Sequence, residues 1–250
     1  MDTNNIPLNR LYDELAYLWP LVSKPENYAE EASYWRDALL DKLEKGKHHI
    51  LELGVGGGNN LSHLTPYFKA TAVDLSESML KNCKKQNPDV DVHIGDMRSI
   101  RLNKNFDAVI IHDAISYFLN ENDMFATFKT ASEHLGSGGI FVTSPDYLRE
   151  TFTDNTVHYH ETKSDGTTAL TFIEYSHDPD PYDTMTEIIL VYFIKKNGQT
   201  KVELDRHLTG LFPKATWINL IQKAGFIVEE KEYPVHDDNR QGWLFVCTKR

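Results

Sequence analysis

Short apolar runs alternate with stretches of helical periodicity through the middle of the chain. The apolar runs predict strands over Ile50–Leu53, Ala70–Val73, Val90–Ile94, Asp107–Ile111 and Gly138–Thr143. Helices are predicted between them over residues 60–67, from Ser76 onwards, and over residues 121–135. Strands that alternate with helices favour a parallel sheet with both faces covered. The pattern therefore predicts an α/β fold.

The two ends of the chain extend this prediction. Apolar residues at helical spacing predict helices within residues 10–45, interrupted by Pro20 and Pro25. Near the other end we expect a helix over Lys214–Lys223, closed by Gly225, and then two strands over Phe226–Glu232 and Trp243–Thr248. The last two strands indicate a reversed hairpin at the edge of the sheet.

Residues 156–208 follow a different rhythm, with β-rich runs and no convincing helix. Turns are predicted at Ser164–Gly166, Asp178–Pro181 and Lys196–Gly198. We therefore expect an inserted four-stranded antiparallel meander. The predicted domains are an N-terminal helical cap, a core in two pieces and the inserted sheet, over residues 1–47, 48–150 with 209–250, and 151–208.

A glycine-rich turn follows the first predicted strand. Ile50–Asn60 places an acid at Glu52 and glycines at Gly54, Gly56, Gly57 and Gly58. Glycine lets a backbone approach a bulky ligand where a Cβ would collide. Asn59 stands where a dinucleotide fingerprint needs its third glycine. The pattern is E-x-G-x-G-x-G, which favours a cofactor cradle over a turn without a ligand.

Acidic residues follow the next two predicted strands. Asp74 can accept two hydrogen bonds from a ribose diol, or it can cap the helix that begins near Ser76. Asp96 can accept a hydrogen bond from an adenine amino group, with Met97 against the ring, or the two can be a turn acid and a core methionine. Because parallel strands end at one edge, these groups are expected around one pocket.

Composition excludes several classes of protein. The 250 residues carry a formal net charge of −11, which disfavours nucleic acid as a partner. No apolar stretch approaches a membrane span, and the N-terminus lacks the pattern of a signal peptide. Cys83 and Cys247 offer no disulfide framework, so we expect a cytoplasmic protein.

The segments LELGVGGG, AVDLSESML, GDMRSI, FDAVIIHDAISYF and HLGSGGIFVTSPD together resemble the core of class I S-adenosylmethionine-dependent methyltransferases. The resemblance implies a Rossmann-like, seven-stranded, mostly parallel sheet and S-adenosyl-L-methionine as cofactor. It assigns the cofactor's methionine part to Glu52, Gly54 and Gly56. It assigns the ribose to Asp74, the adenine faces to Leu75 and Met97, and the adenine amine to Asp96.

The ends of the chain resemble a narrower group. LYDELAYLWPLVSKPENYAEEA, RETF and HLTGLF are similar to segments of the sugar-amine N-methyltransferases, which carry an insertion at the same place and are related to glycine-type N-methyltransferases. This implies a small-molecule acceptor and leaves a homodimer open. Tyr17 and Tyr28 would close over the methionine end of the cofactor, or would pack within the helical cap. Tyr117 would lie beside the acceptor.

Methyl transfer to nitrogen needs a neutral amine, alignment and a route for one proton. His112, Asp113 and Tyr117 follow the fourth predicted strand, which faces the methyl group in such folds. We expect Tyr117 to contact the acceptor or handle the proton, the alternative being a buried aromatic ring with its hydroxyl satisfied. His112 is expected to contact the cofactor or to be a structural histidine.

The inserted sheet is expected to select the acceptor. His158 and His160 alternate along a strand and so share a face, but no third ligand completes a metal site, and we predict no metal. With Tyr175 and His177 they are expected to line the acceptor side. A nucleotide-sugar acceptor would require cations, and the candidates are Arg149, Lys163, Arg206 and Arg240. They form no dense cluster, so a free amine metabolite stays open.

Two other functions remain at this point. A nicotinamide-dependent oxidoreductase would share the sheet, but Asn59, the Gly-Asp-Met segment and the final strand pair count against it. A non-catalytic module that binds an adenosyl ligand is the other, because a fold does not fix a function.

Overall fold

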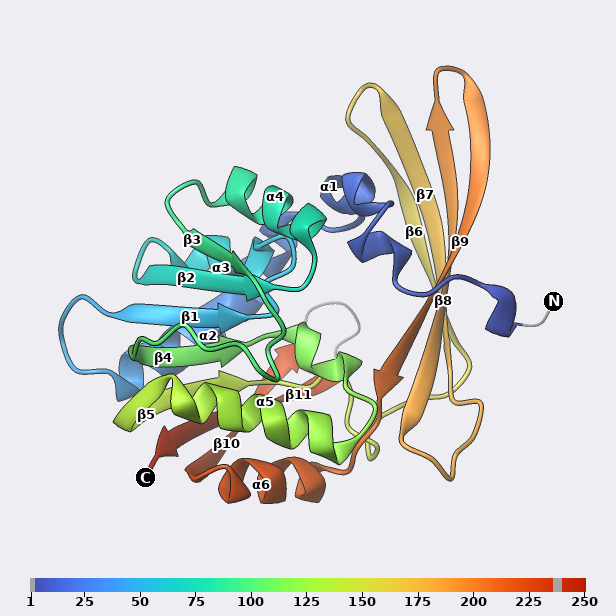
Figure 1. Ribbon diagram of the computed structural model, residues 1–250. Helices are drawn as coiled ribbons and strands as arrows, with labels where there is room; N and C mark the ends of the chain where they lie inside the picture. The colour runs from blue at the N-terminus through green and yellow to red at the C-terminus, as the bar shows by residue number, and fades with distance from the viewer. Residues whose placement is uncertain (1–2, 236–239) are drawn as a thin grey trace.

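The computed structural model describes residues 3–235 and 240–250, with side chains over residues 3–233 and 242–250. An α/β core holds a seven-stranded sheet, and a separate four-stranded sheet stands beside it (Figure 1). In the described part of the chain, no helix has the length and apolar character needed to cross a membrane.

The core sheet has the strand order β10-β11-β5-β4-β1-β2-β3. Every neighbouring pair among β1 to β5 is parallel, whereas β11 runs antiparallel to both β5 and β10. The predicted fold class and the reversed hairpin at the sheet edge are therefore confirmed. The strand bounds are β1 His49–Leu53, β2 Lys69–Asp74, β3 Asp91–Ile94, β4 Phe106–Ile111, β5 Leu135–Thr143, β10 Phe226–Val235 and β11 Arg240–Lys249.

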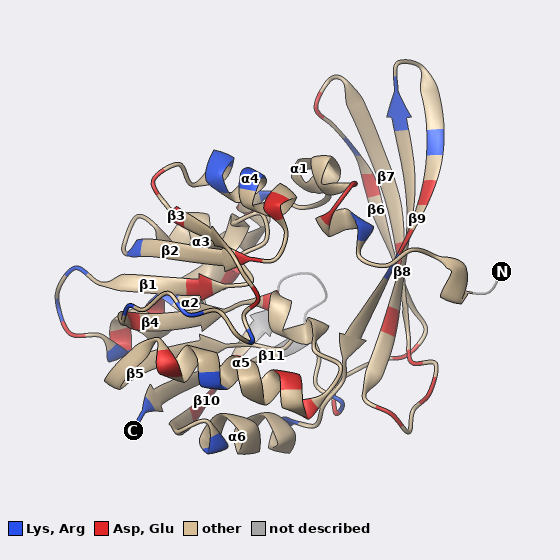
Figure 2. Ribbon diagram, viewed as in Figure 1, with Lys and Arg blue, Asp and Glu red and all other residues tan. Residues whose placement is uncertain are grey.

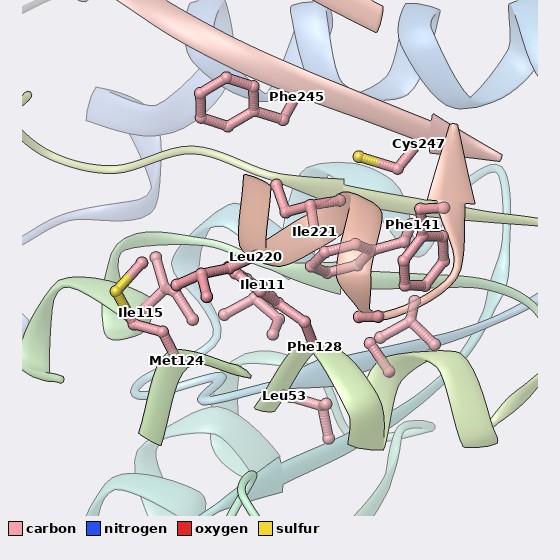
Figure 3. Close-up of a cluster of buried hydrophobic side chains, with 14 of the residues drawn as sticks. Leu53, Ile111, Ile115, Met124, Phe128, Phe141, Leu220, Ile221, Phe245 and Cys247 are labelled. Atoms are coloured by element: carbon pink, nitrogen blue, oxygen red, sulfur yellow. The ribbon is translucent and has the colours of Figure 1, made fainter. Parts of the chain in front are cut away.

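Among the residues that the structure describes, five helices cover the two faces of this sheet: α2 Ala29–Lys42, α3 Asn59–Leu64, α4 Glu77–Gln86, α5 Glu121–Glu133 and α6 Lys214–Lys223. Strand periodicity divides the core, because Leu51 packs with the side chains of α5 and α6, whereas Ile50 packs with those of α2, α3 and α4. Figure 3 shows the first of these layers, in which Phe128 and Phe141 lie 5.7 Å apart between ring centroids. Burial on both faces explains why a central strand such as β4 is almost continuously apolar.

The insertion is the predicted antiparallel meander, with strand order β6-β7-β8-β9. Its strands are β6 Thr156–Ser164, β7 Thr168–His177, β8 Met185–Lys196 and β9 Gln199–Gly210. Asn197 and Gly198 form the two-residue turn between β8 and β9, and both have positive φ, at 51° and 77°. That conformation matches the twist of a hairpin and favours Asn-Gly.

The N-terminal segment differs from the two helices predicted within residues 10–45. Only α2 is long; before it lie η2 Arg10–Tyr12, η3 Ala16–Leu18, α1 Trp19–Val22 and η4 Pro25–Tyr28. Pro20 lies in the first turn of the short helix α1 and Pro25 begins η4, so the two prolines do not separate two full helices. The regularly spaced leucines serve another purpose, since Leu11, Leu15 and Leu18 pack against one face of the inserted sheet. The three-domain division stays a prediction.

Candidate active site

The carboxyl ends of β1, β2 and β4 and the segment that follows β3 border one cavity of about 320 Å³. The N-terminal segment contributes Tyr12, Trp19 and Tyr28 to its wall. This is the crevice at the carboxyl ends of the strands where open α/β sheets bind ligands.

The glycine turn shapes the floor of this cavity. Gly54, Gly56 and Gly58 have φ of 74°, 53° and 76°, a region that favours glycine. A Cβ on Gly54 would lie 2.4 Å from the Ala114 Cβ, so the space itself also requires glycine there. The turn thus brings bare backbone to the cavity.

Asp74 ends β2 and ties the turn in place. Its Oδ2 accepts the Gly56 N–H at 2.8 Å, and its Oδ1 accepts the Ser76 N–H at 2.8 Å. Burial raises the pKa of this carboxyl, while the backbone hydrogen bonds oppose the shift. The cap of α4 is Ser76, whose Oγ accepts the Met79 N–H, so Asp74 is not the cap. Each carboxylate oxygen keeps a second lone pair for a ligand.

Buried polar atoms without partners lie at the start of the glycine turn and just after it. Glu52 is 2% exposed, and burial raises its pKa to about 8, although the nearby His112 opposes the shift. Among the residues that the structure describes, its Oε2 finds no hydrogen-bond partner, and neither does either side-chain atom of Asn60. Both residues line the cavity. Unpaired buried polar groups are costly, so these atoms indicate a polar ligand.

His112 stands at the end of β4 between two carboxylates. Its Nδ1 lies 3.0 Å from Asp113 Oδ2, and its Nε2 lies 3.1 Å from Glu31 Oε1. Burial lowers the pKa of the imidazole, but the two carboxylates outweigh it and raise the pKa well above its ordinary value. The three groups lie close enough to be weighed as a metal site. The carboxylates engage opposite nitrogens of one ring, however, which is the arrangement of an imidazolium with two counterions.

Asp113 also contacts the carboxyl of Asp146. Burial opposes ionisation of Asp113, but the charge and hydrogen bond of His112 hold its pKa below its usual value. Burial and the Asp113 charge raise the pKa of Asp146 well above its own. Asp113 is therefore the ionised member of the pair, and Asp146 carries the shared proton.

Tyr117 faces the cavity from the short turn η5 Asp113–Tyr117. Its hydroxyl lies 2.8 Å from the Tyr12 hydroxyl and 2.6 Å from Nδ1 of His207, which comes from β9. Burial, and next the neighbouring Tyr12, raise the pKa of Tyr117 well above its ordinary value, so the phenol stays protonated. A neutral hydroxyl that faces the cavity can accept or donate a hydrogen bond.

The N-terminal segment closes over the cavity. Trp19 lies against the glycine turn so closely that a Cβ on Gly57 would come within 1.9 Å of its Nε1. Asn59 Nδ2 donates to the Ser23 carbonyl at 3.3 Å, and Asn82 Nδ2 donates to the Ala16 carbonyl at 2.9 Å. Asn59, which takes the place of a dinucleotide glycine, therefore fastens this segment.

Most of the cofactor residues predicted from sequence meet at the cavity: Tyr28, Glu52, Gly54, Gly56, Asp74, Leu75, Met97 and His112, together with Tyr117. Asp96 does not line it. Its carboxylate is held by the Arg98 guanidinium at 2.6 Å, whereas Gly95 and Met97 on either side do line the wall. Tyr17 is 55% exposed and lies outside the wall, to which Tyr12 and Trp19 contribute instead. The individual roles stay predictions.

The predicted acceptor residues on the insertion lie outside this wall. His158 pairs with Glu174, and Tyr175 pairs with Val157, so Tyr175 lies on the opposite face of the sheet from His158 and His160. These rings therefore do not all share one face of the inserted sheet, and their role as acceptor contacts stays a prediction. His160 instead stacks on the buried Phe172 ring, with centroids 3.9 Å apart.

The predicted cations have partners within the protein. The Arg149 guanidinium donates to the Asp183 carbonyl, and Lys163 Nζ donates to the Val22 carbonyl at 3.0 Å. Arg206 pairs with Glu187, which is buried. The side chain of Arg240 lies outside the described residues. Figure 2 shows Lys and Arg intermixed with Asp and Glu over both parts of the molecule.

Sequence reasoning missed Tyr12, Trp19, Asn60 and His207. Asn60 directly follows the glycine turn, which was a usable signal. His207 alternates with Asp205 on one strand face, which predicts a pair but not its contact with Tyr117.

The cavity fits S-adenosylmethionine. Gly54 and Gly56 bring bare backbone to the cavity, and Asp74 offers acceptors for a diol. The unpaired atoms of Glu52 and Asn60 suit the cofactor's ammonium and carboxylate.

Comparison with known proteins supports this fit. Residues 50–139 match the family model described as a methyltransferase domain. A curated relative, the dTDP-3-amino-3,4,6-trideoxy-alpha-D-glucopyranose N,N-dimethyltransferase of Streptomyces venezuelae, is 30% identical over 214 residues, covering 84% of this chain and 88% of the relative.

Solved structures agree with the curated relative. The crystal structure of Streptomyces venezuelae DesVI has a TM-score of 0.80 at 27% identity and covers 95% of this chain and 96% of its own. An amino pentose methyltransferase from Micromonospora echinaspora, solved with S-adenosylmethionine bound, has a TM-score of 0.76 at 22% identity, with 95% of this chain and 96% of its own covered. The chain belongs to the class I S-adenosylmethionine-dependent methyltransferases, close to the sugar-amine N-methyltransferases.

Proposed function

We propose that the chain methylates the amino group of a nucleotide-linked amino sugar. One observation carries this proposal: the similarity to a sugar N,N-dimethyltransferase extends over 84% of the chain, well beyond the general methyltransferase match over residues 50–139. It therefore includes parts of the chain outside the cofactor turn, and we propose that those parts select the acceptor.

The lining of the cavity supports the following cofactor contacts, which are part of the proposal. Asp74 accepts the ribose hydroxyls, Leu75 and Met97 lie on the two faces of the adenine, and Glu52 with Asn60 holds the amino-acid end. S-Adenosylmethionine supplies an electrophilic methyl group on a sulfonium. Trp19 and Tyr28 also line the cavity, and we propose that their rings exclude water from the methyl group, which favours a reaction in which charge is dispersed.

The acceptor side follows from the hydroxyls. Only a neutral amine has the lone pair that displaces the sulfonium. Tyr117, which stays protonated, and Tyr12 present oxygen atoms that can accept an amine N–H and so orient its lone pair. Tyr117 is accordingly our proposed catalytic residue, in agreement with the expectation from sequence.

A nucleotide-linked acceptor carries a diphosphate, which calls for cationic partners, and Arg149, Lys163 and Arg206 already bond within the protein. A diphosphate would have to replace those partners. His158, His160 and Tyr175 stay proposed acceptor contacts, with His158 and His160 on the face that carries Phe172.

Mass spectrometry of methyl transfer tests the proposal. The acceptors are a dTDP-3-amino-3,6-dideoxyglucose, its 3-hydroxy counterpart and the free amino sugar. We expect methylation of the first and none of the second. If only the free amino sugar is methylated, the acceptor is a simple amine and the proposed nucleotide-linked sugar is wrong. Tight cofactor binding without transfer to any amine in a broad panel would favour a non-catalytic module.

We also propose a homodimer in the cytoplasm. One face of the inserted sheet packs against Leu11, Leu15 and Leu18 of the N-terminal segment. The opposite face is apolar and exposed, and the exposed fractions of Val157, Tyr159 and Val202 on it are 63%, 64% and 54%. Such a face suits self-association. Light scattering of the wild type and of Tyr159→Glu tests this, and a monomeric wild type would refute it. The two cysteines are free and buried, in keeping with a reducing compartment.

A further inference from the structure

A hydrogen-bonded row of side chains leads away from the cavity into the inserted sheet. The Tyr12 hydroxyl lies 2.8 Å from that of Tyr117, the Tyr117 hydroxyl lies 2.6 Å from His207 Nδ1, and His207 Nε2 lies 2.9 Å from Asp205 Oδ2. The first two side chains line the cavity, whereas His207 is 2% exposed and Asp205 is fully buried. The row therefore connects the reacting space to a buried ion-pairing group.

Asp205 fixes the direction of every bond in the row. Its oxygens accept the backbone N–H groups of Arg10 at 2.8 Å and Leu11 at 2.7 Å. Burial opposes its ionisation, but the His207 hydrogen bond, the charge of that ring when it is protonated, and these N–H groups hold the pKa of Asp205 below its usual value. An ionised carboxylate only accepts hydrogen bonds, so His207 Nε2 must carry the proton.

The rest of the row follows from that assignment. In the neutral ring, Nδ1 is then the acceptor, and the Tyr117 hydroxyl must donate to it. The Tyr117 hydroxyl uses its own proton in the bond to His207. Its oxygen therefore accepts the hydrogen bond from the Tyr12 hydroxyl and retains one lone pair. A row with this polarity turns an accepting oxygen toward the cavity.

We propose, on the basis of the proposed amine methylation, that His207 held by Asp205 is a positioning residue that takes up, through Tyr117, the proton that the amine loses. The amine lone pair forms the N–C bond while the S–C bonding pair stays on sulfur. The ammonium N–H proton then moves to Tyr117 Oη as the phenol proton moves to His207 Nδ1. The products are a methylated neutral amine, a thioether and an imidazolium beside the Asp205 carboxylate.

This route matters most when one acceptor receives two methyl groups. After the first transfer the nitrogen is an ammonium and has no lone pair, so a second transfer must wait until a proton has left. The same Asp205 also fixes the backbone at Arg10 and Leu11, next to Tyr12. The row is therefore complete only when the N-terminal segment lies on the inserted sheet.

Nuclear magnetic resonance of the histidine ring nitrogens tests the row without any turnover. In the protein loaded with S-adenosylhomocysteine, His207 should be the Nε2–H tautomer, and Tyr117→Phe should shift only its Nδ1 signal strongly. The assignment uses loss of signals in His207→Asn. An Nδ1–H tautomer would overturn the proposal whatever the acceptor proves to be.

Turnover separates proton uptake from positioning. In His207→Asn the side chain can still accept the hydrogen bond from Tyr117 but cannot take up the proton from the amine. In His207→Phe the side chain can do neither. With a dTDP-3-amino-3,6-dideoxyglucose we expect His207→Phe to lower kcat about ten- to hundred-fold. We expect His207→Asn to keep the first transfer within about threefold and to accumulate monomethyl product.

Calorimetric affinity for S-adenosylhomocysteine and the melting temperature serve as folding controls. The matched control variant is His93→Asn, because His93 also bonds an acid, Asp91 at 3.0 Å, but is exposed and lies outside the cavity wall. It should behave as wild type. If His207→Asn also matches wild type in both transfers, proton uptake by His207 is wrong. The wild type and all variants could also fail to methylate the amine although His207 is the Nε2–H tautomer. In that case the hydrogen-bonded row is supported and the proposed acceptor is wrong.

Discussion

Replacing Asp74 by Asn tests the ribose assignment while preserving the shape of the side chain. The carboxylate now accepts one backbone N–H on each oxygen, from Gly56 and from Ser76, both at 2.8 Å. The Asn side-chain amide keeps one accepting oxygen for one of these two N–H groups, and its NH₂ group faces the other N–H, which it cannot accept. One charge-assisted hydrogen bond to backbone is lost, and the charge-assisted bond to the ribose is lost or weakened.

Magnitudes follow from these bonds. A hydrogen bond to a charged group contributes about 1.5–3 kcal/mol, so loss of the ribose contact should weaken cofactor binding about ten- to hundred-fold. The lost backbone bond to the carboxylate falls in the same range of about 1.5–3 kcal/mol, which in a chain of this size lowers the melting temperature by roughly 3–12 °C.

Calorimetry with two ligands gives the decisive measurement. S-Adenosylhomocysteine and methylthioadenosine share the ribose but differ in the amino-acid end, so both should lose affinity by the same factor. Asp91→Asn, an exposed acid on β3, is the matched control and should change neither. Unchanged affinity of Asp74→Asn for both ligands, with the melting temperature lowered as expected, would refute our assignment of the ribose site.

Three further predictions rest on single contacts. Tyr117→Phe should lower turnover about tenfold or more and leave the affinity for S-adenosylhomocysteine unchanged; equal turnover would remove its proton-handling role. Because burial raises the pKa of Glu52 to about 8 from 4.5, the unfolded chain releases this proton at lower pH than the folded protein does. The unfolding free energy of the ligand-free protein should therefore fall by up to about 1.4 kcal/mol per pH unit between about pH 5 and 8. Urea titrations should show a smaller fall for Glu52→Gln, and equal slopes would contradict the assignment. Gly57→Ala should destabilise the protein by about 1–3 kcal/mol because its Cβ would meet Trp19. Trp19→Leu in the same chain should restore most of that loss in thermal melts, and strictly additive losses would show that the two do not touch.

The parts of the fold that local pattern decides were predictable. Apolar runs with glycine turns specify β1, β2 and their neighbours, and Lys214–Lys223 was predicted at the bounds that α6 has. The Asn197-Gly198 turn likewise fixes one hairpin through its own backbone preference. In the N-terminal segment tertiary packing prevailed, because leucines at helical spacing were equally able to cover the inserted sheet from a series of short turns.

The site divides along the same physical line. Glu52, Gly54 and Asp74 each lie within or directly after a strand, so strand order alone gathers them at one rim. Tyr175 and His158 were harder to place because a sheet face depends on pairing register, and one residue of shift exchanges the two faces.

The hydrogen-bonded row from Tyr12 to Asp205 depends on contacts that no local sequence pattern encodes. Tyr12, Tyr117 and His207 are separated by 105 and 90 positions, and they meet only because the N-terminal segment lies between the core and the inserted sheet. Each is unremarkable in its own stretch of sequence: a tyrosine in a short turn, a tyrosine after a strand, a histidine within a strand. Their chemistry arises when Asp205 holds the backbone at Arg10 and Leu11 and the ring of His207 at once. A single buried carboxylate thus both docks the segment that closes the cavity and sets the polarity of the hydroxyls that face the acceptor, so closure and acceptor orientation should be lost together when Asp205 is changed.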